Sequence, residues 1–268
     1  MSDATPTPLP TAPVLRHDTD ARGVHTLTLN TPKSFNALSM AMLQALQGAL
    51  RQVAQDPGAR VVVLAAEGPA FCAGHNLKEM RAHPSPADHQ ALFGLCTQVM
   101  LQIQKLPVPV IAQVQGLATA AGCQLVAQCD LAVAAESATF GVNGIDVGLF
   151  CATPSVPLVR NIPAKVAMEM LLTGGFLSAQ EAQARGLVNR VASAADLPAA
   201  VAELVGAILN KPREAVALGK AVFYQHRETG IEAAYQLAGQ TMVCNLALDV
   251  TQEGIQAFAE KRPPAWRS

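Results

Sequence analysis

The sequence predicts an α/β fold, in which largely parallel strands alternate with helices before a mostly helical C-terminal third. Three observations lead to this prediction. Up to about residue 160, short apolar or alternating runs are separated by loops and by segments with helical periodicity. Beyond that point, helical segments follow one another. Half of the residues are hydrophobic but only 4% are aromatic, so Ala, Val and Leu fill the core, which suits α/β layers.

The expected strands differ in how their two faces are covered. Residues 24–29 alternate apolar and polar side chains, which indicates a half-buried strand. Residues 61–66 are apolar almost throughout and predict a strand that is covered on both faces. Further strands are expected over residues 109–114 and 131–135, and a short one over 139–141.

Capping residues and prolines predict where the helices begin and end. Ser39 is expected to cap a helix that runs to Gln55 and stops before Pro57. Ser178 and Glu181 have the spacing of a capping box, which predicts the start of another helix. The remaining helices are expected over residues 87–105, 123–129, 164–172, 197–209, 213–225, 231–246 and 251–261.

The bulk composition argues against several kinds of partner. The formal net charge of −1 gives no electrostatic case for nucleic acid or for a membrane surface. No apolar run reaches the ~20 residues of a membrane span. The six cysteines form no CxxC pair and the six histidines no HExxH spacing, so we expect free thiols in a reducing cytoplasm and no metal site.

We expect the chain to consist of three parts. Residues 1–14 are rich in Pro and Thr, lack the basic and apolar parts of a signal peptide, and are expected to form a disordered tail. Residues 15–200 are expected to form the α/β core. Residues 201–268 are expected to form a helical region that packs on other subunits of a homo-oligomer.

Two strand-to-helix turns have the composition of ligand-binding loops. The stretch FCAGHNL at 71–77 follows the strand at 61–66, and QGLATAAGC at 115–123 follows the strand at 109–114. Small residues let a ligand approach the backbone closely, and a helix N-terminus offers free N–H groups. Two such turns facing one cleft would aim two N–H donors at one oxygen, as in an oxyanion hole. On composition alone, tight packing is the simpler explanation.

A series of motifs runs in order through the chain: NTPKSFNALS at 30–39, FCAGHNLKEM at 71–80, VQGLATAAGCQL at 114–125, SAQEA at 178–182 and, near the end, Phe258 and Lys261. From about residue 15 to the C-terminus, this series resembles the enoyl-CoA hydratase/isomerase (crotonase) superfamily. AGHNLKEM at 73–80, VGLFCATP at 147–154 and EKRPPAW at 260–266 resemble more closely the enoyl-CoA hydratase domain-containing protein 3 group.

The resemblance implies a crotonase-like spiral of ββα turns with a C-terminal helical trimerisation region, assembled as a homotrimer or a dimer of trimers. It implies an acyl-CoA thioester of fatty acid metabolism as ligand, with coenzyme A as part of the substrate and no separate cofactor. The backbone N–H groups of His75 and Ala121 would hold the thioester oxygen. The substrate-binding residues that it implies are Lys33, Ala73, His75, Asn76, Leu77, Lys78, Ala121, Gln124, Gly144, Phe258 and Lys261, of which the last two would reach the CoA of a neighbouring subunit.

The chain departs from the hydratase pattern at the acid–base positions. The hydratases that it resembles use two glutamates around one water, whereas Gln124 and Gly144 stand at the matching positions here. Gln124 cannot transfer a proton, and Gly144 has no side chain. Ala121 replaces a glycine of the second turn but keeps its N–H. We therefore expect weak or absent hydration, with isomerisation, decarboxylation, thioester hydrolysis or non-catalytic acyl-CoA binding as alternatives.

Other side chains are candidates for the missing acid or base. If residues 144–148 are extended, Asp146 shares a face with residue 144 and points into the same cavity; the alternative is a carboxylate that caps a turn or pairs with a basic residue. Cys151 is a candidate nucleophile if its thiolate is stabilised, and otherwise a buried, inert thiol. The His75 ring titrates near neutrality, although the motif assigns the function to its backbone. Candidates for orienting a substrate are Asn143 and Thr153.

Overall fold

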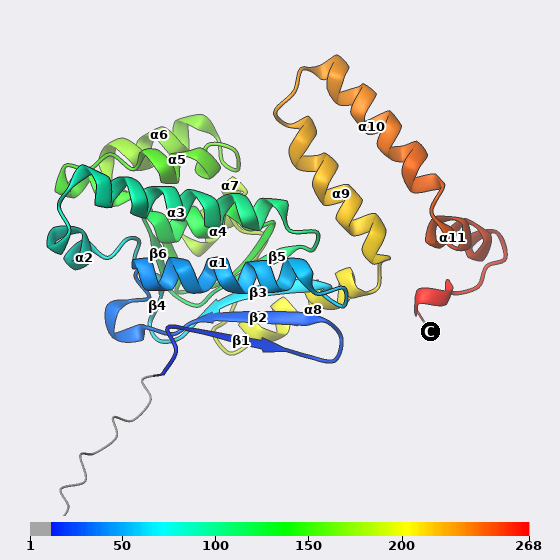
Figure 1. Cartoon of the computed structure of the whole chain (residues 1–268), viewed down its shortest axis with the longest axis horizontal. Helices are drawn as coiled ribbons and strands as arrows, with labels where there is room; N and C mark the ends of the chain where they lie inside the picture. Colours follow the sequence, from blue (N-terminus) through cyan, green and yellow to red (C-terminus); the bar gives the residue numbers. More distant parts are fainter. Residues whose placement is uncertain (1–11, 268) are drawn as a thin grey trace, which may run out of the picture.

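Two sheets lie at the centre of the computed structural model, which describes residues 12–267; the tail predicted over 1–14 thus lies largely outside the described residues (Figure 1). The larger sheet has six strands, β1 (Leu15–Thr19), β2 (Val24–Leu29), β3 (Val61–Ala66), β5 (Val110–Val114), β7 (Leu131–Ala135) and β10 (Arg190–Ala192), in that spatial order. The smaller sheet joins β4 (Ala70–Cys72), β6 (Leu117–Thr119), β8 (Thr139–Gly141) and β9 (Phe176–Ser178). The β1–β2 and β8–β9 pairs are antiparallel, and the other neighbours are parallel.

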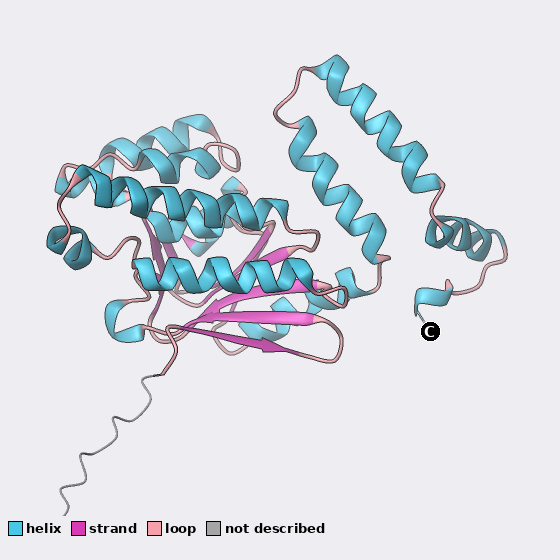
Figure 2. Ribbon diagram, viewed as in Figure 1, coloured by secondary structure: helices cyan, strands magenta, loops and turns pink. Residues whose placement is uncertain are grey.

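Helices connect the strands and form the C-terminal part of the chain (Figure 2). The α-helices are α1 (Met40–Gln55), α2 (Leu77–Ala82), α3 (Pro86–Lys105), α4 (Ala121–Gln128), α5 (Ala152–Leu158), α6 (Ala164–Thr173), α7 (Ala179–Arg185), α8 (Leu197–Leu209), α9 (Arg213–His226), α10 (Ile231–Leu246) and α11 (Asp249–Ala259). Three short 3-10 helices are η1 (Pro32–Ser34), η2 (Asn143–Val147) and η3 (Ala265–Arg267). Both predicted caps are confirmed: the Ser39 side chain accepts a hydrogen bond from the Met42 N–H, and Ser178 and Glu181 form a complete capping box.

Three successive units of two strands and a helical segment build the core. The strands β3, β5 and β7 lie in the larger sheet, and each continues within a few residues into a strand of the smaller sheet, β4, β6 or β8. Helices follow each pair before the chain returns to the larger sheet. The strand-to-helix turns of the first two units therefore lie side by side, because β4 pairs with β6. The predicted α/β class with largely parallel pairing is confirmed.

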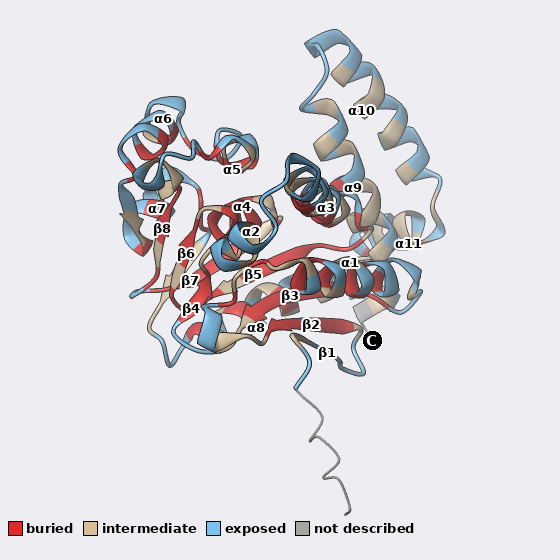
Figure 3. Ribbon diagram, turned by 60° about the vertical axis from the view of Figure 1, so that its left-hand side comes forward, coloured by how far each residue is buried: buried red, intermediate tan, exposed pale blue. Residues whose placement is uncertain are grey.

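Apolar side chains cover both faces of the larger sheet, as the apolar run at 61–66 predicts. On one face, Val61 and Val63 belong to a cluster with Leu197 and Val201 of α8. On the other face, the sheet packs into the main core with α1, α3 and α4. Figure 3 shows buried residues concentrated in the strands and in the inner sides of these helices. The boundary predicted at residue 200 falls inside α8, so the sheet-packed part of the chain extends beyond it.

The structure differs from the sequence predictions at its shortest elements. The strand-to-helix turn expected at 115–123 contains β6, and α4 begins at Ala121, two residues before its predicted start at residue 123. The extended conformation expected for residues 144–148 is wrong, because residues 143–147 form η2. Hydrogen bonds from the N–H groups of residues 148 and 149 close this single turn. An element of five residues is too short to show a helical repeat in the sequence.

The helices α9 to α11 extend away from the two sheets (Figure 1). They carry large apolar side chains that are mostly exposed, including Ile231, Tyr235, Val243 and Phe258. Within the described residues, no helix is both long enough and apolar enough to cross a membrane.

Candidate active site

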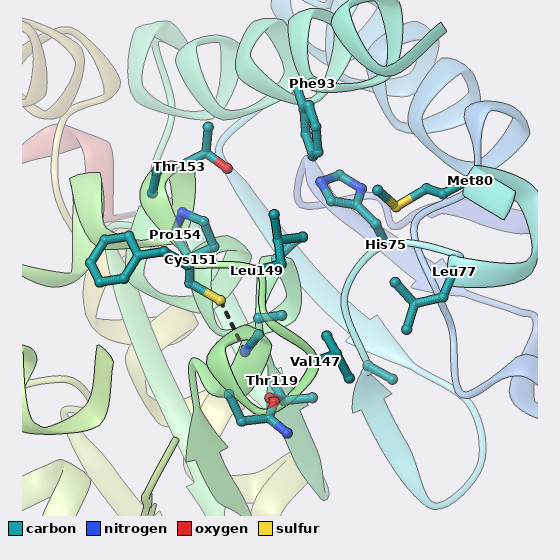
Figure 4. Close-up of a pocket in the computed structure, with 17 residues that line it drawn as sticks. His75, Leu77, Met80, Phe93, Thr119, Val147, Leu149, Cys151, Thr153 and Pro154 are labelled. Carbon is teal, nitrogen blue, oxygen red and sulfur yellow. Dashed lines mark hydrogen bonds between the residues drawn. The ribbon is translucent and has the colours of Figure 1, made fainter. Parts of the chain in front are cut away.

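A cavity of about 400 Å³ opens where the turns after β4 and β6 meet the loop after η2 (Figure 4). Ligand-binding pockets typically measure ~300–1,000 Å³. The wall of the cavity in this protein is mostly apolar. The residues that line the cavity are Ala73, His75, Leu77, Met80, Phe93, Thr119, Ala120, Ala121, Asn143, Gly144, Val147, Leu149, Phe150, Cys151, Ala152, Thr153 and Pro154. The predicted residues Ala73, His75, Leu77, Ala121 and Gly144 are thus brought together. The sequence did not predict the apolar wall that α3 and the loop after η2 contribute. In a helix, an apolar residue that lines a cavity, such as Phe93, cannot be distinguished by sequence from one that packs in the core.

The two turns touch at Gly74, which has a φ of +88°, in the left-handed region that favours glycine. A Cβ at this position would lie 2.9 Å from the Ala120 Cβ and 3.3 Å from the Ala121 backbone nitrogen. Among the described residues, the backbone N–H groups of His75 and Ala121 have no hydrogen-bond acceptor. Two free N–H donors on adjoining turns therefore line one cavity.

Ala120, which precedes α4, has a strained backbone with φ +49° and ψ −120°. Ala120→Gly is expected to raise the free energy of unfolding by about 1 kcal/mol, because glycine adopts this conformation without the steric cost of a Cβ. Urea unfolding at one fixed protein concentration measures the change. Ala91→Gly, at an exposed position within α3, is the matched control and should cost about 1 kcal/mol. Equal losses in both variants would contradict the strain at Ala120.

Neither acid–base position places a carboxylate in the cavity. Gln124 on α4 is buried and is not among the lining residues; its Oε1 has no hydrogen-bond partner in the described part of the chain. Gly144 lines the cavity, but a Cβ there would lie 2.4 Å from the Leu149 carbonyl oxygen and 2.8 Å from the Cys151 Sγ. The surrounding backbone thus leaves no room for a glutamate side chain at residue 144.

The prediction that Asp146 points into the cavity is wrong. Because residues 143–147 turn as a 3-10 helix, Asp146 does not share a face with Gly144 as it would in a strand. Its carboxylate instead lies against Gly174 at the end of α6, where a Cβ would be 2.7 Å from Oδ1. Asn143 Nδ2 is 3.5 Å from the same carboxylate. Asp146 is exposed and is not among the residues that line the cavity.

Cys151 fits the alternative of an inert thiol. Its Sγ accepts a hydrogen bond from the Gly144 N–H at 3.3 Å (Figure 4). Burial raises the pKa of this thiol, so the neutral form predominates at pH 7. Of the two residues predicted to orient a substrate, both Asn143 and Thr153 line the cavity, and Asn143 Oδ1 accepts a hydrogen bond from the Thr119 hydroxyl at 2.5 Å.

The His75 imidazole forms part of the cavity wall. It meets the Phe93 ring edge to face, with centroids 5.2 Å apart. Its Nδ1 lies 3.4 Å from the Leu38 carbonyl oxygen, and its Nε2 is buried without a hydrogen-bond partner among residues 12–267. Burial lowers the pKa of His75 below its usual value, so the ring is neutral at pH 7.

The remaining predicted substrate contacts lie outside this cavity. Lys33 and Lys78 are exposed. Asn76 caps α2, because its Oδ1 accepts hydrogen bonds from the backbone N–H groups of Lys78 and Glu79. Phe258 and Lys261 are exposed at the end of α11, far from α2 within one chain (Figure 1). No group of three or more His, Cys, Asp or Glu side chains in the described range is placed to hold a metal ion.

Comparisons with known proteins agree with the sequence motifs. The family model described as enoyl-CoA hydratase/isomerase matches residues 19–268. Human "Enoyl-CoA hydratase domain-containing protein 3, mitochondrial" is 47% identical over 244 residues, which cover 91% of this chain and 80% of the human protein.

Solved structures match the whole fold. The crystal structure of an enoyl-CoA hydratase from Mycobacterium smegmatis has a TM-score of 0.94 and 58% identity, covering 96% of this chain and 100% of that chain. The crystal structure of human enoyl-CoA hydratase domain-containing protein 3 has a TM-score of 0.91 and 45% identity, covering 94% and 100%. The predicted crotonase-like fold and the closer resemblance to the domain-containing protein 3 group are confirmed.

Proposed function

The chain belongs to the enoyl-CoA hydratase/isomerase family, and from this premise we propose that it binds an acyl-CoA thioester and stabilises the thioester enolate between the N–H groups of His75 and Ala121. The observation that carries the proposal is the pair of unpaired N–H donors on adjoining turns, held together at Gly74. Coenzyme A is then part of the substrate, and no separate cofactor takes part.

The proposed chemistry depends on where negative charge develops. As an enolate forms, charge moves onto the thioester oxygen, and preorganised donors stabilise it without the reorganisation that water would require. Ala121 is the first residue of α4, so the positive end of the helix dipole adds to its N–H. The apolar wall of Leu77, Met80 and Phe93 suits an acyl chain and keeps water from the enolate.

Hydration is proposed to be weak or absent. A positioned general acid or base typically contributes ~10²–10⁴-fold, and no carboxylate is among the residues that line the cavity. Isomerisation, decarboxylation and thioester hydrolysis remain alternatives. Decarboxylation is favoured among them on physical grounds, because breaking the bond to the carboxylate carbon leaves its electrons in the enolate and needs no base. Non-catalytic acyl-CoA binding is the second candidate function.

We also propose a homotrimer or a dimer of trimers. The exposed apolar side chains of α10 and α11, Ile231, Tyr235, Val243 and Phe258 among them, support burial against other subunits. Phe258 and Lys261 would then contact the CoA bound to a neighbouring subunit. Lys33 would lie near the phosphates of the CoA bound to its own subunit, and Lys78 would line that CoA site. The cytoplasmic location stays a prediction. The human relative is named as mitochondrial, which does not support this prediction.

Two measurements test the function. Isothermal titration with CoA, acetyl-CoA and longer acyl-CoAs is expected to show binding, and absence of binding would refute both candidate functions. Mass spectrometry after incubation with enoyl-, malonyl- and acyl-CoAs identifies the reaction. Crotonyl-CoA hydration is expected to be at least ~10³-fold slower than for a hydratase with both glutamates assayed in parallel. Hydration at a comparable rate would contradict the roles assigned to positions 124 and 144.

Ala121→Pro tests the N–H pair directly. Proline is tolerated at the first position of a helix but has no N–H, so turnover should fall by about 10²–10³-fold while the fold is retained. Ala164→Pro, at the first position of α6 and away from the cavity, is the matched control and should leave turnover unchanged. Circular dichroism and thermal melting check that both variants fold. Unchanged turnover in Ala121→Pro would remove this donor from the mechanism.

A further inference from the structure

We propose that the His75 imidazole selects acyl groups that carry a hydroxyl group beyond the reacting carbons, because its Nε2 accepts a hydrogen bond from that hydroxyl. The inference rests on the proposed acyl-CoA function and adds a substrate class to it. Its starting point is that the side chain of His75 lines the same cavity as its backbone N–H.

The partners of the imidazole identify which ring nitrogen is free. Nδ1 lies 3.4 Å from the Leu38 carbonyl oxygen, which can only accept a hydrogen bond. The proton therefore sits on Nδ1, and Nε2 presents a lone pair. Burial lowers the pKa of His75, which keeps the ring in this neutral form at pH 7. The free nitrogen is thus an acceptor.

No described residue satisfies this acceptor. Nε2 is buried and has no hydrogen-bond partner among the described residues. The lining side chains around the ring are apolar, and Figure 4 shows the imidazole between Phe93 and Met80. A buried acceptor without a donor is unfavourable, and such groups are rare in folded proteins. Because Nε2 is covered, a group in the cavity reaches it only when side chains of the cavity wall such as Phe93 or Met80 rotate aside, and that group is then placed to supply the donor.

The surroundings define the chemistry of that donor. A carboxylate would bring only acceptors, and an ammonium group would lose its hydration among apolar side chains. An uncharged hydroxyl on an otherwise apolar chain fits both Nε2 and the wall of the cavity. In Figure 4 the imidazole lies on the α3 side of the cavity, apart from the Cys151–Gly144 contact that marks an acid–base position. The hydroxyl is therefore distinct from the one that a hydratase would add.

A set of matched thioesters tests the proposal. Isothermal titration would compare straight-chain saturated acyl-CoAs of one length that carry no hydroxyl or one hydroxyl at successive carbons beyond C3. The wild-type protein is expected to bind one hydroxylated isomer at least ~10-fold more tightly than the unsubstituted chain, as for other sites built around a polar partner. His75→Phe keeps the backbone N–H and a ring of similar size but removes the acceptor, so the ratio of its affinities for the hydroxylated isomer and the unsubstituted chain should fall to about 1. His75→Gln keeps an acceptor oxygen and should retain part of it.

His83→Phe is the matched control, because it makes the same change at an exposed histidine at the end of α2, outside the cavity. It should keep the wild-type preference. Equal affinity of the wild type for all isomers, or a preference that survives in His75→Phe, would overturn the role of His75 alone. Failure of every thioester to bind the wild type would overturn the proposed function as well. If His75→Phe does not fold, His75→Leu replaces it as the variant without an acceptor. A preference that His75→Gln retains and His75→Leu loses would support the acceptor role. A preference that His75→Leu also retains would overturn it.

Discussion

Gly122→Ala is expected to lower the free energy of unfolding by about 3 kcal/mol or more and to abolish acyl-CoA binding. A Cβ at residue 122 would lie 2.0 Å from the Cys72 carbonyl oxygen, at the end of β4. Both groups belong to the backbone of regular elements, so neither can move aside as a flexible side chain does. The first turn of α4 would have to separate from β4, and the proposed pairing of the Ala121 and His75 N–H groups on one thioester oxygen would be lost. Urea unfolding and isothermal titration with acetyl-CoA measure the two effects.

Gly94→Ala in α3 is the control for the Gly122 substitution. A Cβ at Gly94 meets no atom within 4 Å, so the change should raise stability by up to about 1 kcal/mol through the better helix propensity of alanine. A Gly122→Ala protein with both the stability and the acetyl-CoA affinity of the wild type would contradict the close contact between α4 and β4. Intact stability with lost binding would instead assign the whole effect to the cavity.

The longer elements could be predicted because their signals are local. Residues 61–66 form a strand that is apolar on both faces, and the Ser39 cap and the Ser178 capping box mark helix starts through contacts within four residues. Strands and helices are recognised by side chains that repeat every two or every 3.6 residues, and a segment of six or more residues contains such a repeat. The family motifs then supplied the connection between these elements.

The short strands and the wall of the cavity could not be predicted in the same way. β4 and β6 have three residues each, which leaves no period to detect. They are stabilised by pairing with one another, Ala70 with Leu117 and Cys72 with Ala118, across a long stretch of sequence. The backbone N–H of Ala121 could be named from its motif, whereas the orientation of Asp146 depends on whether residues 143–147 turn or extend. The turn is closed by the hydrogen bond from the Leu149 N–H to the Gly144 carbonyl oxygen, but it also packs on α6, and that contact is not local to the motif.

A further large effect is expected from Lys220→Met, which should lower the free energy of unfolding by about 3–5 kcal/mol. Lys220 on α9 is 9% exposed, and its ammonium donates hydrogen bonds to the carbonyl oxygens of Ile103 and Val108 and, at 2.7 Å, to Asp130 Oδ2. Tyr224 donates to the other carboxylate oxygen. Methionine fills similar space but leaves the carboxylate of Asp130, whose side chain is 14% exposed, without a counter-ion. Helix α9 also loses its main polar attachment to the core. Urea unfolding at a fixed protein concentration measures the loss, since oligomers make stability concentration-dependent.

Two further variants separate the charge from the packing. Lys165→Met, at an exposed position of α6, makes the same substitution without an ion pair and should change stability by less than about 0.5 kcal/mol. Lys220→Met combined with Asp130→Asn removes both charges and should recover part of the loss, because the amide oxygen can still accept from the Val110 N–H, which now donates to Asp130 Oδ2 at 2.7 Å. A double variant as unstable as Lys220→Met alone would show that the lysine acts through its hydrogen bonds to Ile103 and Val108, and that the ion pair itself contributes little to holding α9 on the core.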